Sequence, residues 1–382
     1  MMIKRKECLQ WLVLLGLVCA CSEMKGPTDK VPSDWPIYRG DHALTGSTNT
    51  PAPKKPHLLW SFSTEDAIKS SPVIVNNRIY IGSTDSRLYC RNLQSGEPVW
   101  SLTADEAIEA PALVVDSLLY FGTLSGTMYC LNADNGKEKW RYQVEDRIAG
   151  SANWLQPPGQ PVKWILFGAY DNQLHCLNSL TGEKIQTFMT DNYINGAAAT
   201  DGRRIFFGGC DGLLHITDVV DSTQSGQVDA GSYIPSSPVV DGDRVYVGQY
   251  DGELLCIDLT KKSILWRYRE PDNREAFFSS PAVTGNEVLI GSRDNQLHCI
   301  DKKTGQKKWS FRCRKDVDCS PIVCQDRVIF GSSDGRLYIV ELKNGQLIWS
   351  YEIGKAITGS PAIGQGVLVI GAEDGRVYAF AD

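Results

Sequence analysis

The sequence of 382 residues lacks several features that mark particular classes of protein. It has no run of lysine and arginine with interleaved aromatic residues, and its formal net charge is −6, so we expect no nucleic-acid partner. Beyond the first twenty residues no apolar pattern has a helical period, which argues against a mainly helical fold. The only long apolar run lies within those twenty residues.

Patterns typical of catalysis are also missing. There is no GxSxG elbow, no P-loop and no HExxH sequence. The chain has no adjacent pair of cysteines and no Cys-x-x-Cys-His sequence for haem attachment. The chain has only five histidines that could act as general acids or bases. We therefore expect no catalytic residues, no cofactor and no metal site.

What the sequence does contain is an internal repeat. Eight glycines end short apolar strands at separations of 40, 46, 40, 40, 43, 40 and 40 residues. They are Gly82, Gly122, Gly168, Gly208, Gly248, Gly291, Gly331 and Gly371. A tight turn follows each glycine, such as Asp294-Asn295 or Asp334-Gly335, and residues of this kind tolerate the positive φ of a two-residue hairpin.

Each repeat contains four short strands. In residues 279–311, for example, strands alternate with turns at 294–295 and 304–305, and the last strand carries Trp309 and Phe311. A unit of this size is too small to bury both faces of its own sheet. A repeat of this period with four strands predicts an all-β fold, an eight-bladed β-propeller with four-stranded antiparallel blades, over residues 34–382.

The eighth unit stops after its third strand, and a matching fourth strand stands at the front of the chain. Residues 59–62 read Leu-Trp-Ser-Phe, and residues 377–380 form the last strand. We expect the N-terminal strand to pair with the C-terminal one and close the last blade, which leaves no open inner edge. The alternative is an open ring of seven blades with a loose hairpin.

Residues 1–20 resemble a lipoprotein signal peptide. Lys4, Arg5 and Lys6 precede a short apolar core, which ends in the lipobox-like sequence Val18-Cys19-Ala20-Cys21. We expect Cys21 to be lipidated, residues 21–33 to form a polar tether, and the protein to be anchored in the outer membrane, facing the periplasm or the cell surface. Without residues 1–20 the charge is 36 basic against 44 acidic, or −8. Ordinary signal cleavage nearby is the alternative.

Five of the twelve cysteines are predicted to be buried thiols. These five share one position relative to the glycine of their unit, and equivalent positions in neighbouring blades are too far apart for a disulfide. They are Cys90, Cys130, Cys176, Cys256 and Cys299. The sequence does not decide whether Cys313 and Cys319, near one connection between blades, form a disulfide. His175, His215 and His298 share a position that tyrosine fills in other units, which indicates packing rather than metal binding.

Two motifs resemble those of the pyrroloquinoline-quinone (PQQ) propeller repeats. Residues 301–309, Asp-Lys-Lys-Thr-Gly-Gln-Lys-Lys-Trp, look like their tryptophan-docking motif, and related versions end at Trp100, Trp140 and Trp349. Residues 35–40 with Thr45-Gly46 resemble the opening segment of such proteins. The eight units and the lipobox are most similar to the BamB family, the propeller lipoproteins of the outer-membrane β-barrel assembly machinery. Units three and four lack the tryptophan.

The resemblance implies a non-catalytic scaffold that binds an outer-membrane or periplasmic protein, as a monomeric propeller. Quinoprotein dehydrogenases share the repeat, so a PQQ-dependent enzyme is one alternative. A surface glycan-binding lipoprotein is another alternative, because the aromatic rings of tryptophan and tyrosine could stack on sugars.

One connection between blades is longer than its equivalent and carries the candidate partner-binding residues. The segment from Trp266 to Pro281 has three more positions than the segment from Trp309 to Pro321. The loop has mixed charges with two phenylalanines, which either contact a partner or pack into the blade. The candidates are Arg269, Glu270, Asp272, Arg274, Glu275 and Phe277.

Overall fold

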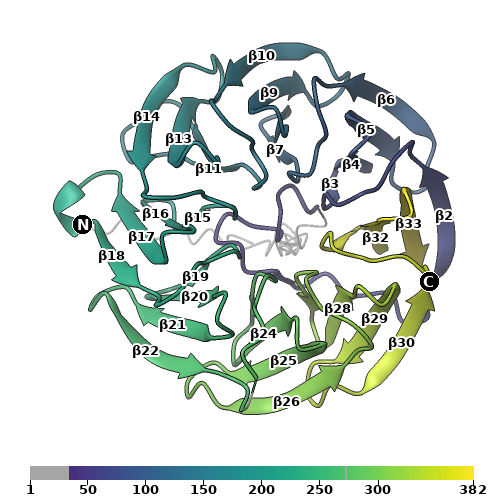
Figure 1. Cartoon of the computed structure of the whole chain (residues 1–382). Coiled ribbons are helices and arrows are strands. Elements are labelled where there is room, and N and C mark those ends of the chain that lie inside the picture. The colour runs from purple at the N-terminus through teal and green to yellow at the C-terminus, as the bar shows by residue number, and fades with distance from the viewer. Residues whose placement is uncertain (1–33, 272) are drawn as a thin grey trace, which may run out of the picture. The chain divides into compact units, whose positions relative to one another are not determined.

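The computed structural model describes residues 34–271 and 273–382, which form a ring of eight antiparallel sheets (Figure 1). Seven sheets have four strands, and the remaining one has the same four plus a short parallel strand. This confirms the predicted all-β, eight-bladed propeller. The predicted signal peptide, the tether and Cys21 lie outside the described residues.

Blades 1 to 4 follow one another along the chain, each built from an inner strand to an outer one. Blade 1 contains β3 (Val73–Val75), β4 (Arg78–Gly82), β5 (Arg87–Asn92) and β6 (Pro98–Thr103). Blade 2 contains β7 (Leu113–Val115), β8 (Leu118–Gly122), β9 (Thr127–Asn132) and β10 (Glu138–Gln143). Blade 3 contains β11 (Asn153–Leu155), β12 (Trp164–Gly168), β13 (Gln173–Asn178) and β14 (Lys184–Met189). Blade 4 contains β15 (Ala199–Thr200), β16 (Arg204–Gly208), β17 (Leu213–Asp218), the 3₁₀ turn η1 (Ser222–Gln224) and β18 (Gly226–Asp229).

Blades 5 to 8 repeat the pattern, and the last takes its outer strand from the front of the chain. Blade 5 contains β19 (Val239–Asp241), β20 (Arg244–Gly248), β21 (Leu254–Asp258) and β22 (Ser263–Tyr268). Blade 6 contains β23 (Ala282–Val283), β24 (Glu287–Ser292), β25 (Gln296–Asp301) and β26 (Lys307–Arg312). Blade 7 contains β27 (Ile322–Cys324), β28 (Arg327–Gly331), β29 (Arg336–Glu341) and β30 (Leu347–Glu352), with β1 (Ser47–Thr48) beside β27. Blade 8 contains β31 (Ala362–Gly364), β32 (Val367–Ala372), β33 (Arg376–Ala381) and β2 (His57–Ser63).

The closure of the ring is the one predicted from the sequence. Strand β2 pairs antiparallel with β33, from His57 opposite Ala381 to Ser63 opposite Arg376. Figure 1 shows the purple β2 beside the yellow β33 at the outer edge of blade 8. The backbone N–H of Ser360 in the connection that enters blade 8 also donates to Ser71 Oγ before blade 1, at 2.8 Å. The open seven-bladed alternative is therefore not what the structure has.

The strand-ending glycines are needed because an apolar side chain lies against each of them. A Cβ added to Gly331 would lie 2.3 Å from Ile357 Cγ2, and one added to Gly122 would lie 2.3 Å from Ile148 Cγ2. The contacting residue comes from the connection to the next blade, and its separation from the glycine along the chain is the same in both cases. No side chain fits there without a shift, so the glycine and its apolar partner set how closely a blade and the connection leaving it approach.

Docked indoles join most neighbouring blades. Five tryptophans donate from Nε1 to a backbone carbonyl of the next blade, at 2.9–3.2 Å, and lie on the glycine of its last turn. These are Trp60, Trp100, Trp140, Trp266 and Trp309. The register places Gln186 and Gly226 at the equivalent positions in blades 3 and 4. The interfaces on both sides of blade 4 therefore lack the docked indole.

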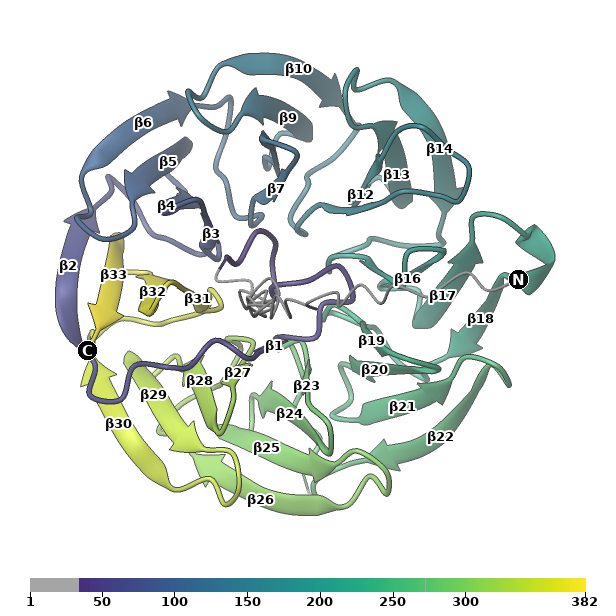
Figure 2. The same ribbon diagram turned by 180° about the vertical axis from the view of Figure 1, so that it is seen from behind.

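The segment before β2 crosses the middle of the ring (Figure 2). Its carbonyls accept hydrogen bonds from the inner strands of several blades, among them His42 O from Thr200 N and Gly46 O from Val323 N. The guanidinium of Arg39 is buried and donates to the carbonyls of Pro281 and Pro321, at 2.7 and 2.5 Å. This segment corresponds to the opening motif recognised in the sequence.

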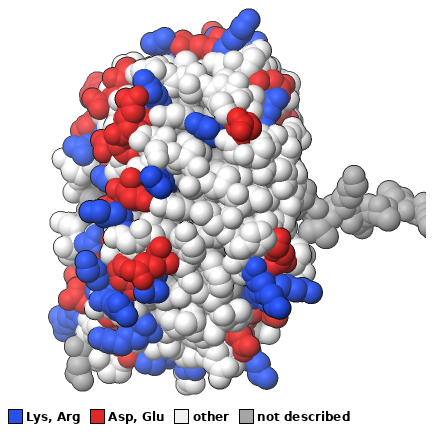
Figure 3. All heavy atoms as spheres, turned by 90° about the vertical axis from the view of Figure 1, so that its right-hand side faces the viewer, with Lys and Arg blue, Asp and Glu red and all other residues white. Residues whose placement is uncertain are grey.

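The two faces of the ring differ because the strands alternate in direction. One face, here called the loop face, carries the connections between blades and the hairpins between second and third strands; the other, the turn face, carries the remaining turns. On the side wall in Figure 3, charges of both signs gather along one edge, and the middle of the wall is mostly uncharged. Among the described residues no helix is long and apolar enough to cross a bilayer.

Candidate functional site

The loop face is the candidate functional surface, because the flat sides of the blades are buried against one another. Its most distinctive element is the long connection from blade 5 to blade 6, residues 269–278, where the candidate partner-binding residues were placed. The structure separates these residues into three kinds. Asp272 lies outside the described residues.

Three of the candidates have exposed side chains. Arg274 and Glu275 are exposed in the middle of the connection, and Arg269 is exposed at its start. The guanidinium of Arg269 pairs with the carboxylate of Glu253 at 2.9 Å, and Arg267 pairs with the same carboxylate at 2.6 Å. These charges are therefore available at the surface, with Arg269 partly held by its partner.

Phe277 is not available to a partner, because it is 2% exposed and packs inside the blade. A Cβ added to Gly248 would lie 2.7 Å from Phe277 Cβ, so Phe277 takes the place that isoleucine or valine takes in the other blades. This is the second of the two alternatives left open by the sequence. The signal was present in the spacing, since Phe277 is as far from Gly248 as Ile357 is from Gly331 once the three inserted positions are allowed for. Phe278 is half-buried, with the Arg293 guanidinium 3.7 Å from its ring centroid.

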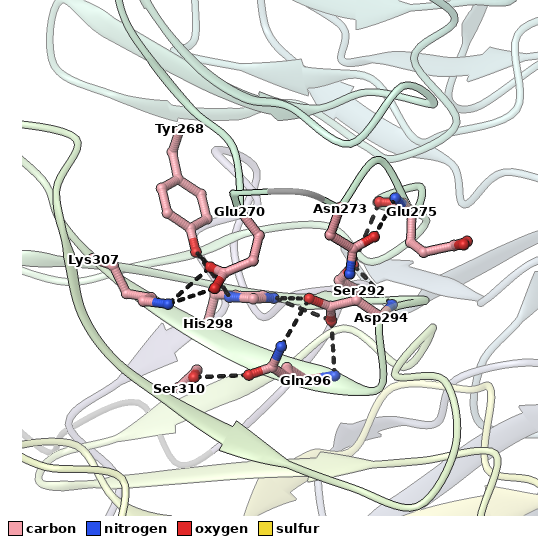
Figure 4. Close-up of polar contacts among 10 residues, drawn as sticks. All are labelled: Tyr268, Glu270, Asn273, Glu275, Ser292, Asp294, Gln296, His298, Lys307 and Ser310. Carbon is pink, nitrogen blue, oxygen red and sulfur yellow. Dashed lines mark hydrogen bonds and ion pairs between the residues drawn. The ribbon is translucent and has the colours of Figure 1, made fainter.

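Glu270 belongs to a polar cluster that joins the connection to blade 6 (Figure 4). Its carboxylate accepts hydrogen bonds from Lys307 Nζ at 2.6 and 2.9 Å and from the Tyr268 hydroxyl at 2.6 Å. Tyr268 lies 3.0 Å from His298 Nδ1, and His298 Nε2 lies 3.1 Å from Asp294 Oδ2. Glu270 is thus engaged within the protein rather than directed at a partner.

The pKa values of both carboxyl groups in this cluster lie below their ordinary values. Burial alone would raise the pKa of Glu270, but hydrogen bonds from Lys307 and Tyr268 outweigh it. Burial likewise opposes ionisation of Asp294, and hydrogen bonds from His298 and Gln296 lower its pKa overall. Both groups are therefore carboxylates at neutral pH.

Three exposed tyrosines lie on the same face. Tyr193 and Tyr233 each precede the buried isoleucine of a connection, and Tyr250 follows a strand-ending glycine; they are 45%, 52% and 49% exposed. Tyr193 stacks on Tyr170 with centroids 4.9 Å apart, and Tyr250 lies 6.2 Å from Tyr233. Together Tyr193, Tyr233 and Tyr250 form what we call the tyrosine row. Aligning the repeats would have revealed Tyr233 and Tyr250.

The cysteines and histidines take structural positions. All nine described cysteines are free, eight of them are buried, and Cys313 and Cys319 form no bridge. Burial raises the pKa of Cys90 to about 12 and that of Cys256 to about 11, so these thiols are unreactive. His175 and His215 each pair with the aspartate of their hairpin, as Tyr89 and Tyr338 do in other blades. The histidine and tyrosine positions are thus interchangeable.

A small cup opens at the centre of the loop face. It has a volume of about 200 Å³, and Tyr38, small residues and the backbone of the connections line it. Serines link neighbouring blades around it: Ser237 N donates to Ser280 Oγ at 3.0 Å, and Ser280 N donates to Ser320 Oγ at 2.8 Å. Its charged side chains are already paired, Lys69 with Glu109 at 2.8 Å and Asp318 with Arg293 at 2.9 Å.

Comparison with known proteins gives one family and several similar folds. The family model described as "Outer membrane protein assembly factor BamB" matches residues 53–187 and 211–382. The crystal structure of BamB from Moraxella catarrhalis is 17% identical over 86% of this chain and 100% of that one, with a TM-score of 0.70. No curated protein sequence matches the chain.

Two dehydrogenases share the fold at still lower identity. A europium-containing methanol dehydrogenase is 12% identical over 92% of this chain and 99% of that one, with a TM-score of 0.74. A quinohemoprotein alcohol dehydrogenase from Comamonas testosteroni is 12% identical over 91% of this chain and 80% of that one, with a TM-score of 0.78. At these identities the likeness shows the fold alone.

The central cup does not fit a quinone tricarboxylate with a divalent cation. Its volume is below the range of about 300–1,000 Å³ typical of small-molecule pockets. The one lysine that could face such an anion, Lys69, is held by Glu109, whose hydrogen bond raises the lysine pKa. Within the described part of the chain no group of three or more His, Cys, Asp or Glu side chains could hold a metal ion.

Proposed function

Because the chain belongs to the family of outer membrane protein assembly factor BamB, we propose that it is a non-catalytic scaffold that binds a protein partner in outer-membrane protein assembly. The family match extends over most of the propeller, from strand β2 of blade 8 to the C-terminus, with a gap only at residues 188–210. The proposed process, outer-membrane protein assembly, is taken from the description of the family. The partner is a component of that process at the outer membrane or in the periplasm.

We place the protein at the outer membrane through a lipid on Cys21. The proposal rests on the lipobox-like residues 18–21, since acyl chains attached there contribute about 0.8 kcal/mol of membrane affinity for each buried methylene. Residues 21–33 would then serve as the tether between the lipid and the propeller. Mass spectrometry of the mature N-terminus tests this, and an unmodified Cys21 would contradict it.

The observation that supports a binding role is the concentration of exposed tyrosine and mixed charge on the loop face. The tyrosine row and the exposed Arg274 and Glu275 belong to connections and hairpins of the same face. Tyrosine and arginine are enriched where proteins bind one another, because each combines a large contact area with a polar group. A closed ring holds such loops rigidly on one face.

Photo-crosslinking in intact outer membranes tests the proposal. A crosslinking amino acid at Tyr193, Tyr233 or Tyr250 is expected to give one discrete protein adduct. The matched control is Lys303, which is exposed on the turn face. Adducts from Lys303 but none from the tyrosine row would mean that the partner contacts the turn face and not the loop face. No adduct at any position would contradict the scaffold role.

The tyrosine row also supports one alternative, glycan binding, because the rings of Tyr193, Tyr233 and Tyr250 are open to solvent and sugars stack on such rings. A glycan array with the purified protein distinguishes the two. A specific sugar ligand that Tyr250→Ala abolishes would favour the alternative.

Dehydrogenase activity is tested by incubating the protein with PQQ and Ca²⁺. The poor fit of the central cup predicts no saturable binding. Saturable binding together with turnover of an alcohol would contradict the non-catalytic proposal.

A further inference from the structure

Three buried histidines occupy equivalent positions and provide an internal comparison. In each, Nε2 faces the aspartate of the preceding hairpin: His175 faces Asp171 at 2.9 Å, and His215 faces Asp211 at 2.7 Å. His298 faces the carboxylate of Asp294 at 3.1 and 3.2 Å. Because an ionised carboxylate only accepts hydrogen bonds, Nε2 of all three histidines must carry a hydrogen.

The other ring nitrogen distinguishes His298 from the other two. Nδ1 of His175 is buried and has no hydrogen-bond partner among residues 34–271 and 273–382. Nδ1 of His215 lies 3.2 Å from the amide nitrogen of Gln227, which donates to it. In neither ring does Nδ1 face an acceptor among the described residues, so only Nε2 has a partner to which it can donate. Nδ1 of His298 instead lies 3.0 Å from the hydroxyl of Tyr268.

Counting hydrogens around Tyr268 determines what Nδ1 of His298 does. The hydroxyl has a single hydrogen, and it lies 2.6 Å from Glu270 Oε2, too close for two oxygens without a hydrogen between them. Glu270 is ionised, because Lys307 donates two hydrogen bonds to it and its pKa lies below the ordinary value. The hydroxyl therefore donates to Glu270, and its lone pair is left to accept from Nδ1.

We propose that His298 is held as an imidazolium, and that its second proton makes the order of the connection at residues 269–271 and 273–278 dependent on pH. The groups that face it are Asp294 from its own hairpin, Tyr268 from β22, and Glu270 from the connection, 3.9 Å from Nδ1. Lys307 of β26 reaches it only through Glu270. The apolar contact is Phe277, whose ring centroid lies 5.9 Å away.

The cluster fastens the loop at both ends (Figure 4). At the start, the carbonyl of Glu270 accepts from Asn273 N at 3.3 Å. Near the end, Ser292 Oγ lies 3.5 Å from the carbonyl of Glu275 and accepts from Asp294 N at 3.2 Å. Loss of the second imidazolium proton leaves one hydrogen for two contacts, Glu270–Tyr268 and Tyr268–His298. Glu270 Oε2 and His298 Nδ1 then compete for the hydroxyl hydrogen of Tyr268, and whenever it goes to Nδ1 the loop loses the bond that Tyr268 donates to Glu270.

Blades 2 and 3 contain the same tyrosine–histidine pair, but without a carboxylate two positions after the tyrosine. Tyr142 and His175 lie 5.9 Å apart, close to the 5.7 Å between Tyr268 and His298. Two positions after Tyr142 the chain has the buried Val144, where Glu270 follows Tyr268. The carboxylate of Glu270 therefore accounts for the difference, and His175 is the matched control.

The direct test is ¹⁵N NMR of the full chain labelled at histidine. At neutral pH both ring nitrogens of His298 are expected to show imidazolium shifts, while His175 and His215 show the neutral form with hydrogen on Nε2. Substitution His298→Tyr assigns the signal. A neutral His298 at that pH would overturn the proposal, whatever the partner of the protein proves to be.

Amide hydrogen exchange tests the consequence for the loop. As the pH rises from about 6 to about 9, protection of residues 269–271 and 273–278 is expected to fall by about tenfold beyond the intrinsic rate change, the scale of one lost hydrogen bond. Tyrosine occupies the same position in four other blades, so His298→Tyr preserves the fold and should remove this dependence. His175→Tyr should leave it unchanged. Protection that does not vary with pH in the wild type, or that still varies in His298→Tyr, would contradict the proposal.

Discussion

Lys262 of blade 5 lies against Gly226 of blade 4, in the space that a docked indole fills between other blades. A Cβ on Gly226 would lie 2.8 Å from Lys262 Cδ, and the Lys262 ammonium donates to the carbonyl of Ser225 at 2.7 Å. Gly226 stands where other blades have tryptophan, and Lys262, at a φ of 50°, stands where the next blade has the turn glycine. The two departures from the repeat compensate one another.

This pairing predicts that the two residues must be exchanged together. Gly226→Trp alone places an indole on the lysine side chain and should lower the free energy of unfolding. Adding Lys262→Gly makes room for the ring and removes the left-handed conformation from a non-glycine residue, worth about 1 kcal/mol. Denaturant unfolding of both single variants and the double variant checks this. A double variant no more stable than Gly226→Trp would contradict it.

The contact between Gly331 and Ile357 predicts a strong effect of a single methyl group. Gly331→Ala is expected to lower the free energy of unfolding by about 1–3 kcal/mol, the cost of overpacking a core. In a double-mutant cycle with Ile357→Ala, the two losses should be less than additive, because the smaller side chain makes room for the added methyl group. Gly285→Ala is the control, because no atom lies within 4 Å of its added Cβ. Equal melting temperatures for Gly331→Ala and Gly285→Ala would refute the steric account.

Charge reversal at Arg274 separates binding from folding. The side chain is exposed on the loop face, so Arg274→Glu should reduce partner capture in a pull-down and leave the melting temperature unchanged. Phe277→Ala is the opposite case: it removes a buried ring, at a cost of about 3–5 kcal/mol. If Arg274→Glu captures the partner as well as the wild type does, this part of the loop is not the contact.

The lowered pKa of Asp294 predicts how stability depends on pH. In the unfolded chain an aspartate has a pKa of about 3.9, so the unfolded state binds the proton first as the pH falls. The contribution of Asp294 is complete above that value and is lost as the pH falls through the lower pKa of the folded state. Melting temperatures of Asp294→Asn should therefore fall less steeply than those of the wild type below about pH 4.

Asp211, whose pKa is also lowered despite its burial, should behave in the same way when replaced by asparagine. Slopes steeper than the wild type in either variant would mean that the sign is wrong.

The sequence predicted the fold through residues whose positions repeat. The spacing of Gly82 and its equivalents predicted the blades, and the unmatched strand at Trp60 predicted the closure, because both follow from local geometry copied along the chain. The same spacing places Phe277 in the core once the inserted residues are counted. Its burial was thus within reach of the sequence.

The candidate site was less predictable, because it depends on contacts between blades. Tyr268, Glu270 and His298 come from blades 5 and 6 and the connection between them. No pattern in the chain indicates that the hydroxyl of Tyr268 donates its hydrogen bond to Glu270. The pairing of Lys262 with Gly226 also joins two blades. Repeats specify each blade, whereas side chains that depart from the repeat acquire their roles only through their neighbours.

The pairing of β2 with β33 makes closure of the ring wait until all eight blades have been synthesised. Strand β2 leaves the ribosome before any complete blade, and its partner β33 follows the other seven blades, so β2 must wait for β33 to emerge. Such a distant contact is slow to form, because the entropy of closing the long intervening chain is lost first. A polypeptide that stops before β33 leaves β2 without its partner strand, so closure of the ring requires translation through β33.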